Sequence, residues 1–499
     1  MRDGAHLLCY ADRLGGDLGR LRRLLNGPLA GFAGVHVLPF FVPFDGPDAG
    51  FDPVDHASVD PRLGSWDDIA RLAADGRTVM ADLIVNHLSA DSAEFRDWLA
   101  RGPDSPYDGL FLRYRDVFPD GAAEAAITAF YRPRPGLPFT PYQAADGTRH
   151  LVWTTFMPSQ VDINVRHPAG RAYLARVLRT FAAAGVAVVR VDAVGYAVKT
   201  PGTDSFMTPE TLAYIRDLAA LCHECGLATL VEVHAHYSQQ LAVAPLVDYV
   251  YDFATPALLL HSLRTGTADR LAQWDAIRPR NAITVLDTHD GIGVIDAGPL
   301  GGRPGLISAD EMAAIFDWVD EASGGVSGQA SVVPAWCALP HQANTAFYDA
   351  LGRDDAAYLL ARAVQFFLPG VPQVYYVGLL AGGNDLALWR QTGQGREVNR
   401  HRYTDDEVAA ALGAEIVQAL FGLMALRRRP VFHGRYRFTH LGDGRAELHW
   451  EHAGETLTLT VDLAERRTVI VEIVGGRRRE YRGTADLAAL GRGGTRNPT

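Results

Sequence analysis

Apolar runs of strand length recur along most of the chain, and segments with helical spacing separate them. Eight such runs cover residues 6–12, 34–41, 78–87, 186–196, 228–234, 247–254, 281–290 and 370–378. Between them, segments such as 167–185 and 209–226 repeat apolar residues at helical spacing and end at glycine. Strands that alternate with helices in this way predict an α/β fold with parallel strands. Eight units fit a (β/α)8 TIM barrel, and a doubly wound open sheet is the alternative.

Two segments between the predicted strands are too long for ordinary loops. One follows the third predicted strand and the other follows the seventh, so both leave the barrel at its active face. We therefore expect both to be lids over the cleft. After about residue 430 the pattern changes to period two, which predicts a C-terminal antiparallel β domain with a frayed tail from residue 491. The predicted parts are barrel 1–87, insertion 88–165, barrel 166–290, insertion 291–355, barrel end 356–430 and β domain 431–499.

Three of the apolar runs end in a carboxylate, at Asp192, Glu232 and Asp290. A buried charge is costly unless something uses it. Three such residues at the ends of parallel strands predict one cleft that holds an acid, a base and a nucleophile. Each carboxylate could instead be the N-cap of a following helix. That alternative explains one residue well, but it explains all three together poorly.

The neighbours of these carboxylates suit the cleavage of a glycosidic bond, for which retaining enzymes use two carboxyl groups roughly 5 Å apart. Arg190 lies two residues before Asp192, so both side chains face the same way on a strand. The guanidinium would lower the pKa of Asp192 and keep it ionised as a nucleophile. Glu232 lies between two valines, an apolar setting that suits an acid. Asp290 follows His289 and could hold substrate hydroxyls.

Net charge, the N-terminal sequence and the cysteines indicate which partners and which cellular compartment to expect. The net charge of −11 argues against a nucleic-acid or anionic-membrane partner. The N-terminal apolar stretch is too short for a signal peptide or a membrane span, so we expect a cytoplasmic protein. Cys222 and Cys225 form a lone C-x-x-C, which we expect to be reduced structural thiols because no second pair completes a zinc site. Lysine occurs once, at Lys199, and we attribute its position after the Asp192 strand to chance.

Four short motifs resemble those of the α-amylase superfamily, at residues 82–87 (DLIVNH), 189–196 (VRVDAVGY), 230–234 (LVEVH) and 286–290 (LDTHD). Longer stretches at 36–72, 131–140, 285–296 and 361–378 resemble the sucrose phosphorylases and their close relatives. This resemblance covers most of residues 6–430. It implies a barrel enzyme that transfers an α-glucosyl unit from a sucrose-type donor to inorganic phosphate with retention of configuration. It implies small-molecule partners alone, and leaves monomer and homodimer both open.

The resemblance also implies roles for individual residues. Asp192 would be the nucleophile, Glu232 the acid and then the base, and Asp290 the stabiliser of the transition state. The residues implied around the glucosyl unit are Asp48, Phe51, His87, Phe156, Arg190, His289 and Arg400. Those implied around the acceptor and phosphate are Arg134, Gln160, Tyr196, His234, Leu339, His341 and Gln342. We expect no organic cofactor, because side chains supply the nucleophile and the acid. We expect no metal, because Asn86, a calcium-ligand position in many amylases, lacks a partner cluster of carboxylates.

The second insertion departs from the sucrose phosphorylase pattern. Residues 338–344 read ALPHQAN where those enzymes have a stretch like LDLYQVN, so Leu339 replaces an aspartate that contacts fructose and His341 replaces a tyrosine. Loss of a carboxylate and gain of an imidazole, particularly a protonated one, favour a phosphorylated acceptor. We therefore expect fructose 6-phosphate first, fructose second, and glycerol or glycerate third.

Two other classes of protein are alternatives, because they use or retain some of the same three carboxylates. An α-glucosidase or a transglucosidase would need the same three carboxylates, and independence from phosphate would reveal it. A non-catalytic scaffold of the superfamily would have lost part of the carboxylate set, whereas this chain retains all three residues.

Overall fold

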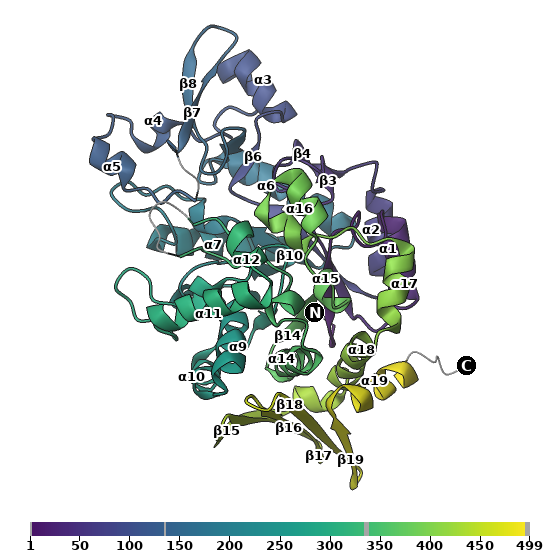
Figure 1. The fold of residues 1–499 in the computed structure, drawn as a ribbon. Coiled ribbons are helices and arrows are strands. Elements are labelled where there is room, and N and C mark those ends of the chain that lie inside the picture. Colours follow the sequence, from purple (N-terminus) through teal and green to yellow (C-terminus); the bar gives the residue numbers. More distant parts are fainter. Residues whose placement is uncertain (1, 134–135, 334–338, 495–499) are drawn as a thin grey trace.

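The computed structural model describes residues 2–133, 136–333 and 339–494, and its centre is a closed barrel of eight parallel strands (Figure 1). These strands are β1 (His6–Cys9), β2 (Gly34–Val37), β5 (Thr78–Ile84), β10 (Val188–Asp192), β11 (Ala228–Val231), β12 (Tyr249–Asp252), β13 (Ala282–Thr284) and β14 (Val371–Tyr375). Each lies within one of the eight predicted runs. Because β1 pairs with both β2 and β14, the sheet has no edge, and the open-sheet alternative is wrong.

The barrel interior has an apolar layer below a polar one. Met80, Val188 and Leu230 belong to one buried cluster inside the barrel. Residues two positions further along each strand share the same face, which places Asp82 and Arg190 in the next layer, toward the carboxyl ends of the strands. Along these strands, the inward-facing side chains thus change from apolar to polar toward the carboxyl ends, where the barrel opens.

Helices cover the outside of the barrel. The predicted helices are α6 (Pro168–Ala183) and α7 (Pro209–Glu224), and each starts with a proline, whose fixed φ suits a first helical turn. The other helices of the barrel part are α1 (Leu18–Asn26), α2 (Trp66–Ala74), α8 (Tyr237–Val243), α9 (Ala254–Thr265), α10 (Asp269–Ile277), α14 (Asp355–Phe367), α15 (Tyr376–Leu379), α16 (Leu386–Thr392), α17 (Asp405–Gly413) and α18 (Glu415–Arg427). Cys222 on α7 and its neighbour Cys225 are free thiols.

Among the described residues, no single helix has the length and apolar character to cross a bilayer. The pair α17 and α18 meets that criterion only when taken together, and the two helices are bent by 75° relative to each other. Helix α18 is almost wholly buried in this structure, where it packs against α14 and α19 (Gly483–Gly494).

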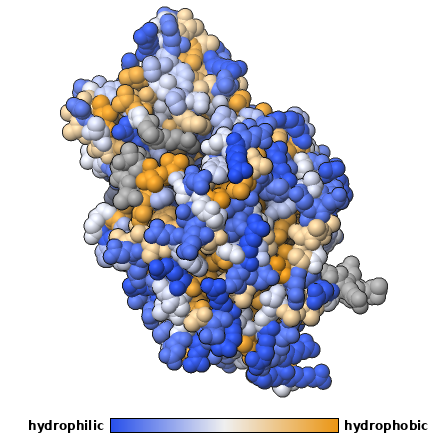
Figure 2. Space-filling view, in the orientation of Figure 1, coloured by the Kyte–Doolittle hydropathy of each residue, from blue (hydrophilic) through white to orange (hydrophobic). Residues whose placement is uncertain are grey.

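The first insertion forms the upper lobe in Figure 1. It contains α3 (Ala93–Arg101), α4 (Tyr114–Val117), α5 (Glu124–Thr128), the hairpin β7 (Phe139–Gln143) with β8 (Arg149–Trp153), and β9 (Gln160–Asp162). Strand β9 pairs with β6 (His87–Ser89), directly after the third barrel strand, so the insertion returns to the barrel mouth. Apolar surface gathers at the junction of this lobe with the body of the molecule (Figure 2). That the lobe acts as a lid stays a prediction.

The second insertion is largely helical, with α11 (Ala309–Ala322), α12 (Val326–Ala330) and α13 (Phe347–Ala350). Its return segment meets the loop after the seventh strand. There Ile292 and Ala343 exchange backbone hydrogen bonds of 2.9 Å in both directions. This contact holds residues 341–344 beside Asp290.

The C-terminal part is an antiparallel sheet of five strands followed by α19. The strands are β15 (Arg435–Gly442), β16 (Arg445–His452), β17 (Glu455–Asp462), β18 (Arg467–Val474) and β19 (Arg477–Arg482). Alternating apolar residues predicted the first four strands, but β19, with four arginines among its six residues, was missed. The expectation of a frayed tail is wrong for residues 491–494, which are helical, because Leu487 and Ala488 of α19 are buried in the core. The rest of that tail, residues 495–499, lies outside the described residues.

Candidate active site

Arg190 organises the mouth of the barrel. Its side chain is only 2% exposed, and its Nη1 lies 2.8 Å from Asp192 Oδ1. Its Nη2 forms an ion pair with Glu232 Oε1. Asp192 ends β10 and Glu232 directly follows β11, so neighbouring strands present both carboxylates to one guanidinium. The structure therefore brings Asp192 and Glu232 together.

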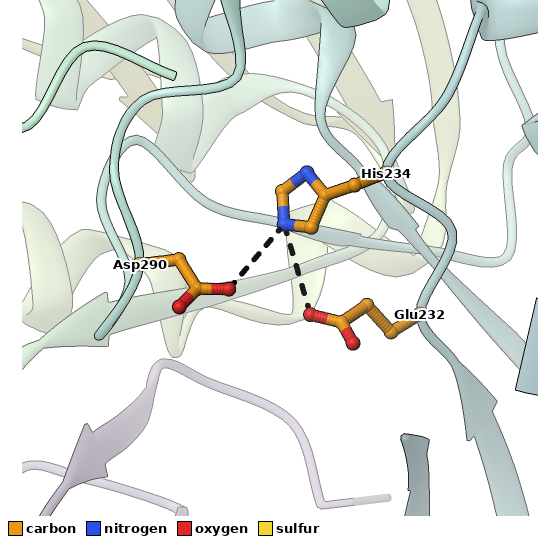
Figure 3. A group of neighbouring side chains, drawn as sticks. All are labelled: Glu232, His234 and Asp290. Atoms are coloured by element: carbon orange, nitrogen blue, oxygen red, sulfur yellow. Dashed lines mark ion pairs between the residues drawn. The ribbon is translucent and has the colours of Figure 1, made fainter. Parts of the chain in front are cut away.

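His234 links Glu232 to Asp290 (Figure 3). Its Nε2 lies 3.7 Å from Glu232 Oε1 and 3.9 Å from Asp290 Oδ2. One ligand atom from each of the three residues lies within 4.8 Å of the others, a spacing that could hold a metal ion. The cations of Arg190 and Arg396 already pair with Glu232 and Asp290, however, and would oppose a second cation. The three carboxylates thus share one pocket, and arginine side chains offset part of their charge.

Beneath the pocket, Asp82 on β5 also faces Arg190, at 2.6 Å, and His36 on β2 lies 3.0 Å from Asp82. The Arg190 guanidinium therefore forms ion pairs with three carboxylates. Burial raises the pKa of Asp192 well above its usual range, and the charge of Arg190 offsets only part of that rise. Arg190 lowers this pKa as expected, but burial outweighs it, so the expectation that Arg190 keeps the pKa of Asp192 low is wrong. The charge of Arg190 favours the ionised form of Asp192, which is the form that a nucleophile needs.

Asp290 has the opposite charge environment. Burial raises the pKa of Asp290, but nearby positive charge, above all that of Arg396, outweighs burial and holds this pKa well below its usual range. Arg396 Nη1 lies 2.7 Å from Asp290 Oδ1. Sequence reasoning missed Arg396, because an arginine in a polar segment looks like a solvated surface charge. Its place four residues before Arg400, in GREVNR, was the only signal.

The residues implied around the glucosyl unit form one connected set. The Phe51 ring stacks on His289, with centroids 4.9 Å apart and planes 10° apart. Arg400 donates from Nε to the His289 carbonyl oxygen at 2.8 Å. His87 Nε2 lies 2.9 Å from the Phe51 carbonyl oxygen, and its ring lies 5.2 Å from that of Phe156. The structure thus places these side chains around the carboxylates.

Asp48 joins this set through Gln160. The Gln160 amide donates to Asp48 Oδ2 at 2.9 Å and lies 3.1 Å from His87 Nε2. The Asp48 backbone N–H donates to Asp52 Oδ1 at 3.2 Å, which fixes the loop that carries Asp48 and Phe51. Burial raises the pKa of Asp52 to about 6. Gln160, implied for the acceptor side, therefore contacts the glucosyl set.

The residues implied around the acceptor and phosphate do not form one connected set like that around the glucosyl unit. Gln342 Oε1 accepts from the Gly291 N–H at 3.3 Å, next to Asp290. Tyr196 meets Phe156 edge to face at 5.1 Å. Burial, with the charge of His234, lowers the pKa of His341, so the protonated imidazole invoked for a phosphorylated acceptor is disfavoured.

Two other acceptor residues add little. Leu339 is half-buried against the hydrophobic core. Arg134 lies outside the described residues.

Lys199 has a defined role that the sequence did not reveal. Its ammonium lies 2.8 Å from Asp162 Oδ2 and donates to Thr155 Oγ1 at 2.7 Å and to Asn86 Oδ1 at 3.4 Å. It also donates to the Tyr196 carbonyl oxygen. These oxygens come from the first insertion and from the loops after the third and fourth barrel strands. The lysine thus supplies a cation at the Asn86 position and ties the insertion to the barrel.

Replacing Lys199 with methionine should destabilise the junction of the insertion and the barrel. Asp162 is 1% exposed, and removing the ammonium leaves its charge buried without its cation. Such a loss typically costs about 3 kcal/mol. Thermal unfolding would measure it, and the double variant K199M/D162N should recover part of the loss. Unfolding of K199M at the wild-type temperature would contradict the assignment.

Comparison with known proteins places this arrangement among related chains. Residues 29–243 match the protein family Alpha amylase, catalytic domain. The chain is 47% identical over 474 residues to sucrose phosphorylase of Agrobacterium vitis, covering 94% of this chain and 97% of the relative. It is 46% identical over 478 residues to sucrose phosphorylase of Bifidobacterium adolescentis, covering 95% and 94%. The crystal structure of sucrose 6F-phosphate phosphorylase from Thermoanaerobacter thermosaccharolyticum aligns with a TM-score of 0.89 and 32% identity, over 97% of this chain and 98% of that one.

Proposed function

Because the chain belongs to the α-amylase family, within the group of sucrose phosphorylases and their close relatives, we propose that it is a retaining glycoside phosphorylase. It transfers an α-glucosyl unit from a sucrose-type donor to inorganic phosphate and yields α-glucose 1-phosphate. The observation that carries the proposal is the convergence of Asp192 and Glu232 on one guanidinium, with Asp290 beside them.

In the first half-reaction, Glu232 donates its proton to the glycosidic oxygen, and the bond from that oxygen to the anomeric carbon breaks. An oxygen of Asp192 forms a bond to the anomeric carbon from the opposite face, which gives a β-glucosyl ester. Asp290, ionised at neutral pH, holds hydroxyls of the sugar where positive charge develops on the ring. The leaving group departs as the free ketose or its phosphate ester.

In the second half-reaction, an oxygen of inorganic phosphate attacks the anomeric carbon. The bond to Asp192 breaks with its electron pair and restores the carboxylate, while Glu232, now ionised, can accept a proton from the nucleophile. Two inversions restore the α configuration. The set formed by Asp48, Gln160, His87 and Phe51 encloses the glucosyl unit, which limits transfer to a single glucosyl residue.

For the donor we propose sucrose 6-phosphate, with sucrose second. Leu339 stands where the sucrose phosphorylase pattern has an aspartate, so a phosphate ester on the leaving sugar meets one repulsive charge fewer. His341 contributes hydrogen bonding there rather than positive charge, given its lowered pKa. Sucrose itself is favoured by the 47% and 46% identity to the two proteins named sucrose phosphorylase.

Initial rates of glucose 1-phosphate release from the two donors would test this proposal. We expect kcat/KM for sucrose 6-phosphate to exceed that for sucrose by about tenfold, the size expected when one charge repulsion is removed. The reverse preference by the same factor would reject the phosphorylated donor. Omission of phosphate should stop product release from either donor, whereas a hydrolase would form free glucose at an unchanged rate.

A further inference from the structure

A phosphate dianion that enters this pocket meets strong negative charge. The carboxylates that face the site in the described structure are Asp48, Asp192, Glu232 and Asp290. The attacking phosphate therefore needs a cation with donors to spare, besides Arg134, which the resemblance implies for phosphate and which lies outside the described residues.

Most of the buried cations among the described residues offer little to a ligand. Burial lowers the pKa of His234, but nearby negative charge, above all that of Asp296, outweighs burial and raises it. This ring already faces Glu232 and Asp290. Arg190 is committed to three carboxylates. Arg400 is 5% exposed and pairs with Glu397 at 3.2 Å, while its Nε donates to the His289 carbonyl oxygen. Burial holds the pKa of His87 and His289 below the usual range, so both rings are neutral at pH 7.

Arg396 differs from these cations in being accessible. Its side chain is 44% exposed, and it lies on the solvent side of Asp290, which is 9% exposed. Nη1 pairs with Asp290 at 2.7 Å, and Nη2 donates to Gln342 Oε1 over a long 3.4 Å. A guanidinium carries five N–H donors in a planar fork, so three have no partner among the described residues and can bind an anion.

We infer that Arg396 binds the attacking inorganic phosphate beside Asp290. This inference rests on the proposed function and assigns the phosphate site within it. A glucosyl unit that donates hydroxyls to Asp290 competes with Nη1 for the same carboxylate. The guanidinium is therefore released toward a ligand at the stage when the glucosyl-enzyme awaits phosphate.

The backbone that carries Arg396 is held firmly, as a binding residue requires. It belongs to the short 3₁₀ segment Gly395–Asn399. Glu397 pairs with Arg13 at 2.8 Å, and the Asn399 amide donates to the Thr288 carbonyl oxygen at 3.0 Å. A Cβ on Gly395 would lie 1.9 Å from the Ala330 carbonyl oxygen, so the second insertion packs directly on this segment.

The partition of the glucosyl-enzyme between phosphate and water provides the test. Both products, glucose 1-phosphate and glucose, come from the same intermediate, so their ratio at fixed phosphate does not depend on how fast that intermediate forms. We expect Arg396→Gln to lower this ratio by about tenfold or more and to raise the phosphate concentration for half-maximal rate, because a charged hydrogen bond is lost. Arg396→Lys, which keeps the charge without the fork, should lose less.

Arg402→Gln is the matched control. Arg402 is 55% exposed and pairs with a different carboxylate, Asp12, at 3.4 Å, so this variant removes the same charge from the same stretch of chain. It should keep the wild-type ratio. If R396Q and R396K reduce both products equally and leave the ratio unchanged, Arg396 only holds Asp290 in place and the inference is overturned. Failure of the proposed function looks different, because the wild type would then form no glucose 1-phosphate.

Discussion

Replacing Asp192 with alanine should abolish turnover and leave the protein folded. The carboxylate forms the covalent bond to the anomeric carbon, and no neighbouring group can take its place on that face of the sugar. Removal of a nucleophile costs about 10⁴-fold or more in kcat. The fold should survive, because Arg190 keeps its ion pairs with Asp82 and Glu232. Glucose 1-phosphate release and thermal unfolding would measure the two effects.

Asp248→Ala provides the control for this experiment. Asp248 also flanks a barrel strand, but it precedes β12 and so lies at the opposite, amino-terminal end of the barrel. There it pairs with His223 at 2.7 Å. D248A should retain activity. Near-normal turnover by D192A would remove Asp192 from its proposed role.

Replacing Glu232 with glutamine should separate the acid from the nucleophile. Glutamine keeps the size of the side chain but carries no transferable proton, so cleavage of a sucrose-type donor should fall by about 10³-fold. α-Glucosyl fluoride needs no proton to leave, and E232Q should still transfer its glucosyl unit to Asp192. Rates of fluoride release and of ketose release would show this difference.

D192A is the comparison for the Glu232 variant, because it should lose activity with both donors. If E232Q loses fluoride release as completely as ketose release, Glu232 does not act as the acid. Its contact with Arg190 would then be structural.

The barrel could be predicted from the sequence because its strands are buried on both sides. Such strands read as continuous apolar runs, and β5 and β10 are examples. Strand β19 could not be found in this way. Its sequence RRREYR buries only Tyr481, and its pairing with β18 at the edge of the sheet supplies the rest.

Contacts between site residues that are close in sequence could be predicted. Contacts between site residues from distant segments could not. Asp192 and Arg190 share a strand face, so their contact follows from spacing alone. Apart from the nearby Tyr196, the partners of Lys199 come from two distant segments, and so their convergence appears only once the first insertion is folded. The raised pKa of Asp192 was not predicted for the same reason, because burial, its largest cause, follows from the folded barrel and insertions.

Trapping the glucosyl-enzyme tests the central claim most directly. E232Q treated with α-glucosyl fluoride should accumulate a covalent intermediate, because the base that would activate water is missing. Peptide mass spectrometry should then find one glucosyl residue on the peptide that contains Asp192, and added phosphate should release it as α-glucose 1-phosphate. A label on another residue, or product formation through a route that never modifies Asp192, would contradict the mechanism.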